Sequence, residues 1–180
     1  MTLAGTTIDE TGGTGVTEQG VPREPGGEVY DWFVRGLALL EGGNAEAAAE
    51  LLAHARSAEP SSASILEALA RATFDAGRYT RAAELFAELA DASPDNDYAR
   101  FGLGLTRLRM GDVPAGVEQL AMAATMRPGR QDYQRALREA RATLAAREDA
   151  GLPGAIGPDE RSGLGSWLPG TGETTDEAGG

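Results

Sequence analysis

Residues 63–96, ASILEALARATFDAGRYTRAAELFAELADASPDN, decide the fold of this chain. Their apolar residues recur every three to four positions in two runs, and Ala-Gly-Arg at residues 76–78 separates the runs. This spacing predicts two amphipathic helices. The turn between them is so short that the second helix must run antiparallel to the first.

The markers of this stretch recur 34 residues earlier and 34 residues later in the chain. A fixed period of this length indicates stacked supersecondary units, each of which buries an apolar face against its neighbour. The recurring markers are Pro60, Pro94 and Pro128; Gly43, Gly77 and Gly111; and Gly36, Ala70 and Gly104.

The period divides the middle of the chain into three units and a final helix. The units cover residues 29–62, 63–96 and 97–130, and a capping helix follows at 131–149. We therefore expect an all-α domain over residues 28–149 with seven helices. Helical spacing places them near residues 29–41, 45–58, 63–75, 79–92, 97–109, 113–126 and 131–149.

Local signals support these boundaries. Asn44, Ser61 and Asp112 are predicted N-caps, because their side-chain oxygens can accept the free amides of a first helical turn. Pro114 fits the first turn of its helix, where a missing N–H costs little. Small residues recur where paired helices would cross, and they allow close backbone approach. These residues are Gly36, Ala70 and Gly104, and then Ala48, Ala82 and Gly116.

The two ends of the chain differ from the middle in composition. Residues 1–27 and the acidic, Gly- and Pro-rich residues 150–180 show no helical or alternating period, which predicts disordered tails. The net charge is −12, from 28 acidic and 16 basic residues, and most of the excess acid lies in these tails. This charge gives no support to a nucleic-acid partner.

The sequence lacks the residue types that several classes of chemistry require. The chain has no cysteine and no lysine, so thiol, disulfide and Schiff-base chemistry are excluded; the Arg-only basic set is typical of a GC-rich, bacterial genome. No apolar run approaches the roughly 20 residues of a membrane span. The N-terminus shows no secretory pattern, so we expect a cytoplasmic protein without a membrane partner.

With these markers in register, the chain resembles the tetratricopeptide repeat family over about 102 residues, from 29 to 130. The family pattern of Trp, Leu-Gly, Tyr, Ala, Phe and Pro matches Trp32 and Gly36 in the first unit, Phe86 in the second, and Leu103-Gly104 in the third. Arg35, Arg100, Thr73 and Arg107 depart from it. The resemblance implies a right-handed α-solenoid that binds peptides in a concave groove, without cofactor or metal.

In this family the first helix of each unit lines the groove, so the resemblance also identifies candidate site residues. The stripes of the outer units are apolar and nearly identical, whereas the middle stripe contains a charge pair. We expect a groove with two aromatic walls and a polar floor. Its residues are Tyr30, Phe33, Leu37 and Leu40; Ser64, Glu67, Arg71 and Phe74; Tyr98, Phe101, Leu105 and Leu108; with Arg109 at the rim.

A second interpretation is that these aromatic residues belong to the solenoid core. The charges of Glu67 and Arg71 favour the groove, since a core excludes unpaired charge. Some members of the family clamp a C-terminal carboxylate with Lys and Asn. Arg71 is the only basic anchor expected inside this groove, so that clamp is not assigned.

Two further segments have alternative interpretations. The final helix carries Arg135, Arg138 and Arg141 outside an inner stripe of Leu137, Ala140 and Leu144, which fits a solvating cap or a patch for an acidic partner or the acidic tail. In the C-terminal tail, Leu164, Trp167 and Leu168 form an apolar cluster. This cluster is either incidental or a motif that docks into the groove, in the same chain or in a neighbouring one.

Catalytic and metal sites find no support. His54 is the only histidine, and the pairs Glu46/Glu50 and Glu84/Glu88 fit solvated helix faces better than a metal site. We therefore expect a non-catalytic adaptor that binds a peptide or helix of a partner protein. The alternative is a self-associating structural module that uses the aromatic stripes or the Trp167 segment.

Overall fold

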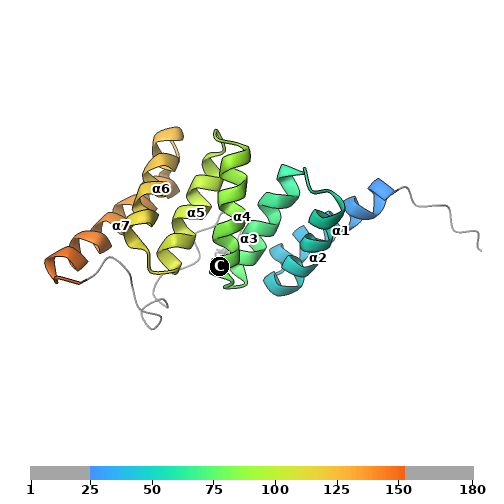
Figure 1. The fold of residues 1–180 in the computed structure, drawn as a ribbon, viewed down its shortest axis with the longest axis horizontal. Coiled ribbons are helices and arrows are strands. Elements are labelled where there is room, and N and C mark those ends of the chain that lie inside the picture. The colour runs from blue at the N-terminus through green and yellow to red at the C-terminus, as the bar shows by residue number, and fades with distance from the viewer. Residues whose placement is uncertain (1–24, 153–180) are drawn as a thin grey trace, which may run out of the picture.

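The structure, a computed structural model, describes residues 25–152. Within this range the chain forms seven helices and no strand, so the all-α prediction is confirmed (Figure 1). The helices are α1 (Pro25–Glu41), α2 (Ala45–Ala58), α3 (Ala63–Asp75), α4 (Tyr79–Ala92), α5 (Asp97–Arg109), α6 (Val113–Met126) and α7 (Gln131–Asp149).

The first helix begins earlier than its sequence pattern predicts. It starts at Pro25 rather than near residue 29, so residues 25–27 do not belong to a tail. Pro25 provides a fixed backbone angle suited to a first helical turn, whereas Gly26 and Gly27 hide the helical period. The other six helices have the expected bounds.

Each pair of helices is joined by the same turn. Gly43, Gly77 and Gly111 have φ values of +77°, +75° and +87°, a region that residues with a Cβ rarely adopt. After α3, the amide of Gly77 donates to the carbonyl of Phe74 (2.9 Å) and the amide of Arg78 to that of Thr73 (3.0 Å). This pair of bonds is a Schellman motif, and its repetition explains the glycine period.

Two of the three predicted N-caps are found in the structure, and the third cap is the neighbouring residue. The side chains of Asn44 and Asp112 cap α2 and α6 as predicted. Ser62 rather than Ser61 accepts the amide of Ile65 at the start of α3. Asn96 also caps α5, by accepting from the amide of Ala99 at 2.8 Å.

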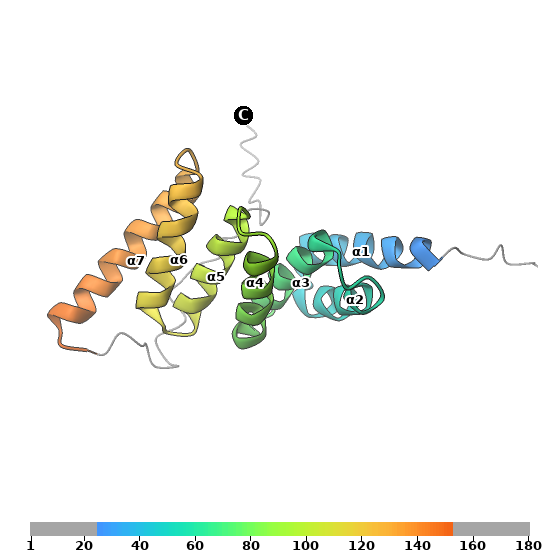
Figure 2. The same ribbon diagram turned by 45° about the horizontal axis from the view of Figure 1, so that its top comes forward.

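The helices stack in a single row from α1 to α7 (Figures 1 and 2). Each helix packs against the next one along the chain, and the first helices α1, α3 and α5 also touch one another in order. One core of apolar side chains, mostly Ala and Leu, runs through the row. Antiparallel pairs in such a row form an α-solenoid, in which each unit contacts only its neighbours.

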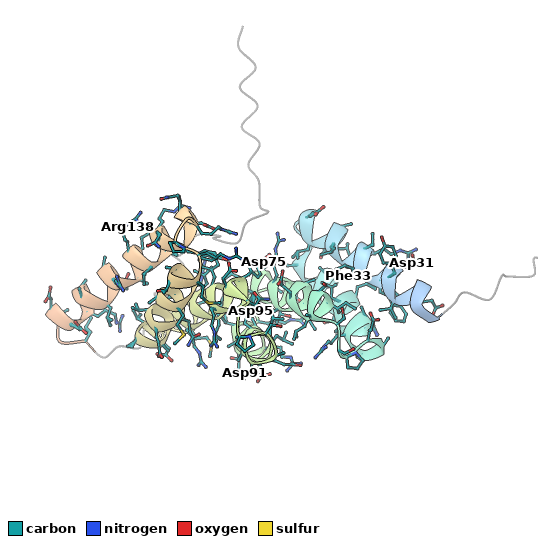
Figure 3. All side chains as sticks on the ribbon, turned by 90° about the horizontal axis from the view of Figure 1, so that it is seen from above. Asp31, Phe33, Asp75, Asp91, Asp95 and Arg138 are labelled. Atoms are coloured by element: carbon teal, nitrogen blue, oxygen red, sulfur yellow. The ribbon has the colours of Figure 1, made fainter. Side chains whose placement is uncertain are left out.

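The final helix closes one end of the row. Leu137 and Ala140 are buried and Leu144 is partly buried, as the inner stripe predicts, and Tyr133 is fully buried beside them. Arg138 and Arg141 are exposed. Viewed from above, Phe33, Asp75 and Arg138 follow one another along the row, whereas Asp91 lies at the opposite edge (Figure 3). None of the helices in residues 25–152 has the length and apolar character needed to cross a bilayer.

Candidate functional site

A groove of about 370 Å³ lies between α1, α3 and the start of α5. It brings together residues from all three repeat units, and seven of the predicted groove residues line it. Its lining consists of Phe33, Leu37, Leu40, Ala63, Ser64, Glu67, Ala68, Arg71 and Tyr98.

Helix α1 provides the apolar wall of this groove. Phe33 and Leu37 are half-buried, and Leu40 is buried beneath them. Tyr30 is 67% exposed and lines an adjoining hollow of about 250 Å³ that also includes Phe33 and Ser64. The two hollows share residues, so the apolar surface continues to the end of the solenoid at α1.

Helix α3 provides the polar wall, in which Arg71 is the central residue. Its Nε lies 3.8 Å from Oδ2 of Asp75 one turn later. The Nε and Nη2 atoms are buried and have no hydrogen-bond acceptor among the described residues. Burying hydrogen-bond donors without acceptors costs free energy, so a ligand oxygen that reached this guanidinium would stabilise the wall.

The neighbours of Arg71 are also polar and held in place. Glu67 Oε2 accepts from Nδ2 of Asn96 at 3.4 Å, which links α3 to the cap of α5. Burial raises the pKa of the Asp75 carboxyl above its ordinary value, and the Arg71 guanidinium offsets part of this rise. Burial also raises the pKa of the Tyr98 hydroxyl. The wall can therefore both donate and accept hydrogen bonds.

The predicted second aromatic wall is wrong except at Tyr98, which lines the groove. Phe101 is 0% exposed and stacks on Tyr133 of α7, with 4.3 Å between ring centroids. Leu105 and Leu108 are buried in the same core. The physical reason is that α7 places the aromatic ring of Tyr133 directly on Phe101, whereas α3, which follows the first unit, lines the groove beside Phe33 with Ser64 and Glu67.

Two other predicted residues also lie apart from the groove. Phe74 is buried, and its ring makes an edge contact with Tyr79 at 5.5 Å between centroids. The guanidinium carbon of Arg109 lies 6.0 Å from the Phe74 ring centroid, so Arg109 covers Phe74 rather than forming part of the groove. The sequence reasoning missed Asp75, although its position four residues after Arg71 is a helical ion-pair spacing.

The remaining candidates form surface contacts. His54 is exposed, and its ring lies 6.3 Å from that of Trp32. Arg78 pairs with both Glu46 and Glu50, the latter at 3.0 Å. Within the part of the chain that the structure describes, no three carboxylate or imidazole groups gather at a metal-binding distance. The Trp167 cluster lies outside the described residues.

Two family models match the sequence, and both describe the tetratricopeptide repeat. They match residues 33–97 and residues 73–140. A comparison with curated proteins gives no match.

Solved structures share the fold at low sequence identity. A structure of MamA from AMB-1 superposes with a TM-score of 0.57 at 23% identity, covering 68% of this chain and 67% of that one. The first TPR domain of human RPAP3 gives 0.64 at 15%, covering 71% and 99%. The second TPR domain of human RPAP3, in complex with the HSP70 peptide SGPTIEEVD, gives 0.61 at 17%, covering 66% and 98%.

Proposed function

Because this chain belongs to the tetratricopeptide repeat family, we propose that it is a non-catalytic adaptor that binds a segment of a partner protein in the groove between α1, α3 and α5. The observation that carries this proposal is the pairing of a half-buried apolar wall with a polar wall in which Nε and Nη2 of Arg71 have no hydrogen-bond acceptor among the described residues. An apolar surface that stays partly accessible beside a few polar groups is the usual character of a ligand groove.

The two walls suggest the chemistry of the partner segment. An apolar side chain would lie against Phe33 and Leu37, while main-chain or side-chain oxygens of the segment would accept from Arg71. This division follows the usual logic of peptide grooves, in which apolar pockets and hydrogen bonds act together. Binding of an HSP70 peptide by a structural relative supports a peptide ligand. Glu67 and Asp75 flank Arg71 here, so the proposal does not include a clamp for a C-terminal carboxylate.

A peptide selection tests the proposed function. Random twelve-residue peptides displayed on phage would be selected against the full chain, and the selected peptides titrated calorimetrically. Phe33→Ala should weaken binding roughly 30-fold, equivalent to losing one anchor of about 2 kcal/mol. The matched control is Val34→Ala, because Val34 is 43% exposed on the same helix but does not line the groove. Equal affinities of the wild type and Phe33→Ala would contradict the proposal.

A further inference from the structure

We propose that residues 164–168 of this same chain, Leu-Gly-Ser-Trp-Leu, occupy the groove, with Trp167 against Phe33 and Leu37, and that an outside partner must displace them. This inference rests on the proposed function, since it requires that the groove hold a protein segment. It adds an occupant and a form of regulation.

The groove has room and surface for an indole ring. Its volume is about 370 Å³, and its apolar wall is half-buried rather than covered by another described helix. An aromatic side chain buries roughly 150–250 Å² on docking, more than an aliphatic one. Trp is also a frequent anchor at protein interfaces.

The number of residues between Leu152 and Trp167 is large enough for Trp167 to reach the groove. From Leu152, the 15 residues to Trp167 span at most about 50 Å, and the four residues to Ile156 span at most about 14 Å. Phe33 and Leu37 lie on α1, which is three packing steps from α7 along the row, or about 30 Å, and α7 itself is about 28 Å long. A path of about 40 Å to α1 therefore lies within reach of Trp167 and beyond that of Ile156.

The composition of the two terminal segments also favours Trp167 as the residue that occupies the groove. Residues 1–24 contain no aromatic residue, and Trp167 is the only aromatic residue after Leu152. Gly163 and Gly165 lie beside the cluster, and without side chains they allow the main chain to approach a wall closely. Main-chain carbonyl oxygens are neutral acceptors, so they can satisfy Arg71 without adding charge beside Glu67 and Asp75.

Weak docking is enough for this contact to matter. A segment tethered to its own site acts at an effective concentration in the mM range, so even a mM affinity gives substantial occupancy. An outside ligand then binds with an affinity reduced by the fraction of grooves that are free. A segment that fills nine-tenths of the grooves would weaken the apparent affinity of a partner about tenfold.

Fluorescence of Trp167 tests the proposal in the full chain. Trp32→Phe leaves Trp167 as the only tryptophan. We expect its emission to lie at shorter wavelength, and its quenching by acrylamide to be weaker, than for a synthetic peptide of residues 158–172. Leu37→Asp and Ser64→Tyr should each abolish both differences. Ser64 is exposed at the groove, so its replacement blocks the site without disturbing the core.

Controls separate this contact from other arrangements. Val34→Asp should leave the Trp167 signal unchanged, and circular dichroism at 222 nm checks that each variant is folded. Emission and quenching equal to those of the free peptide would overturn the proposal. A second contrary result is protection of Trp167 from acrylamide that persists in Leu37→Asp and Ser64→Tyr but disappears in the double variant Arg138→Gln/Arg141→Gln. That result would place the segment on α7 and would also overturn the proposal. Protection that requires high protein concentration would assign the contact to a neighbouring copy and also overturn it.

The experiments distinguish a failure of the Trp167 docking proposal from a failure of the proposed adaptor function. If Trp167 is free while selected peptides still bind through Phe33, only the occupant is wrong. If no outside peptide binds but Trp167 is protected through Leu37, the groove serves the chain itself and the adaptor function is wrong.

Discussion

At the scale of single residues, Tyr133 joins α7 to the last repeat unit through several kinds of contact. It stacks on Phe101, and its hydroxyl donates to Oδ2 of Asp97 at 3.0 Å. The Arg130 guanidinium carbon lies 4.6 Å from its ring centroid. The other carboxylate oxygen of Asp97 accepts from Nε of Arg127 at 2.9 Å. One carboxylate therefore joins three segments of the chain.

Because its hydroxyl is buried, we expect Tyr133 to make the folded chain less stable at alkaline pH. Burial and the hydrogen bond to Asp97 raise its pKa, and burial does the same for Tyr98. Below pH about 10 the folded and unfolded chains both keep these protons; above it the unfolded chain releases them first. The free energy of unfolding should then fall with rising pH, by up to about 1.4 kcal/mol per pH unit for each group.

Urea unfolding at pH 8, 10 and 11, followed by circular dichroism, measures this effect. Tyr133→Phe should show a shallower fall than the wild type, and Tyr98→Phe/Tyr133→Phe the shallowest. The same pH dependence in all three proteins would show that neither hydroxyl is responsible.

At the scale of helices, the backbones of α5 and α6 lie close together where the two helices cross. A Cβ placed on Gly104 would lie 3.1 Å from the carbonyl oxygen of Gly116 and 3.0 Å from the amide nitrogen of Leu120. Both neighbours are backbone atoms, which cannot turn away as a flexible side chain could. By contrast, the three atoms nearest to a Cβ on Gly36 all belong to the side chain of Leu52, the first of them at 2.6 Å. The α5–α6 crossing is therefore the less tolerant of the two.

Gly104→Ala should lower the free energy of unfolding by about 1–3 kcal/mol, because the added methyl group overpacks this crossing. Thermal unfolding followed by circular dichroism would measure the loss. The matched control is Gly129→Ala, since a Cβ at Gly129 meets no atom within 4 Å. If the two variants had equal melting temperatures, the crossing would not be as tight as the structure indicates.

At the scale of the whole molecule, the two ends of the solenoid differ. At one end α7 covers Phe101 and leaves Arg138 and Arg141 exposed. At the other end α1 leaves Tyr30 and Val34 exposed at 67% and 43%. A solenoid needs a polar cap to stay soluble. Only the α7 end has one among the described helices.

Removal of the cap should destabilise the entire row. A chain that ends at Arg130 loses the burial of Tyr133 and Leu137, which we expect to cost about 4 kcal/mol at roughly 2 kcal/mol for each large side chain. It should melt at lower temperature and aggregate, as measured by circular dichroism and light scattering. A chain that ends at Leu152 keeps α7 and serves as the control. An unchanged melting temperature of the shorter chain would show that α7 is not a cap.

Much of the fold was predictable because its determinants are local. Six helices have the predicted bounds, since glycines with positive φ, capping side chains and helical periods each act within a few residues. The exceptions are also local in cause: the Gly26-Gly27 pair hides the start of α1, and two adjacent serines compete to cap α3.

The sequence by itself determined the repeat, its helices, their turns and the polar interruption at Glu67 and Arg71. Only the tertiary structure decided which of two nearly identical stripes faces solvent. The Tyr30–Phe33 stripe lies beside the groove, whereas Phe101 in the matching stripe is buried under Tyr133. The reason is that exposure depends on which side chains the following helix places against the stripe: α7 places the Tyr133 ring on Phe101, whereas α3 lines the groove beside Phe33 with the polar Ser64 and Glu67. The exposure of each stripe is therefore set by a helix some 30 residues away in the chain, and the residues of the stripe alone do not predict it.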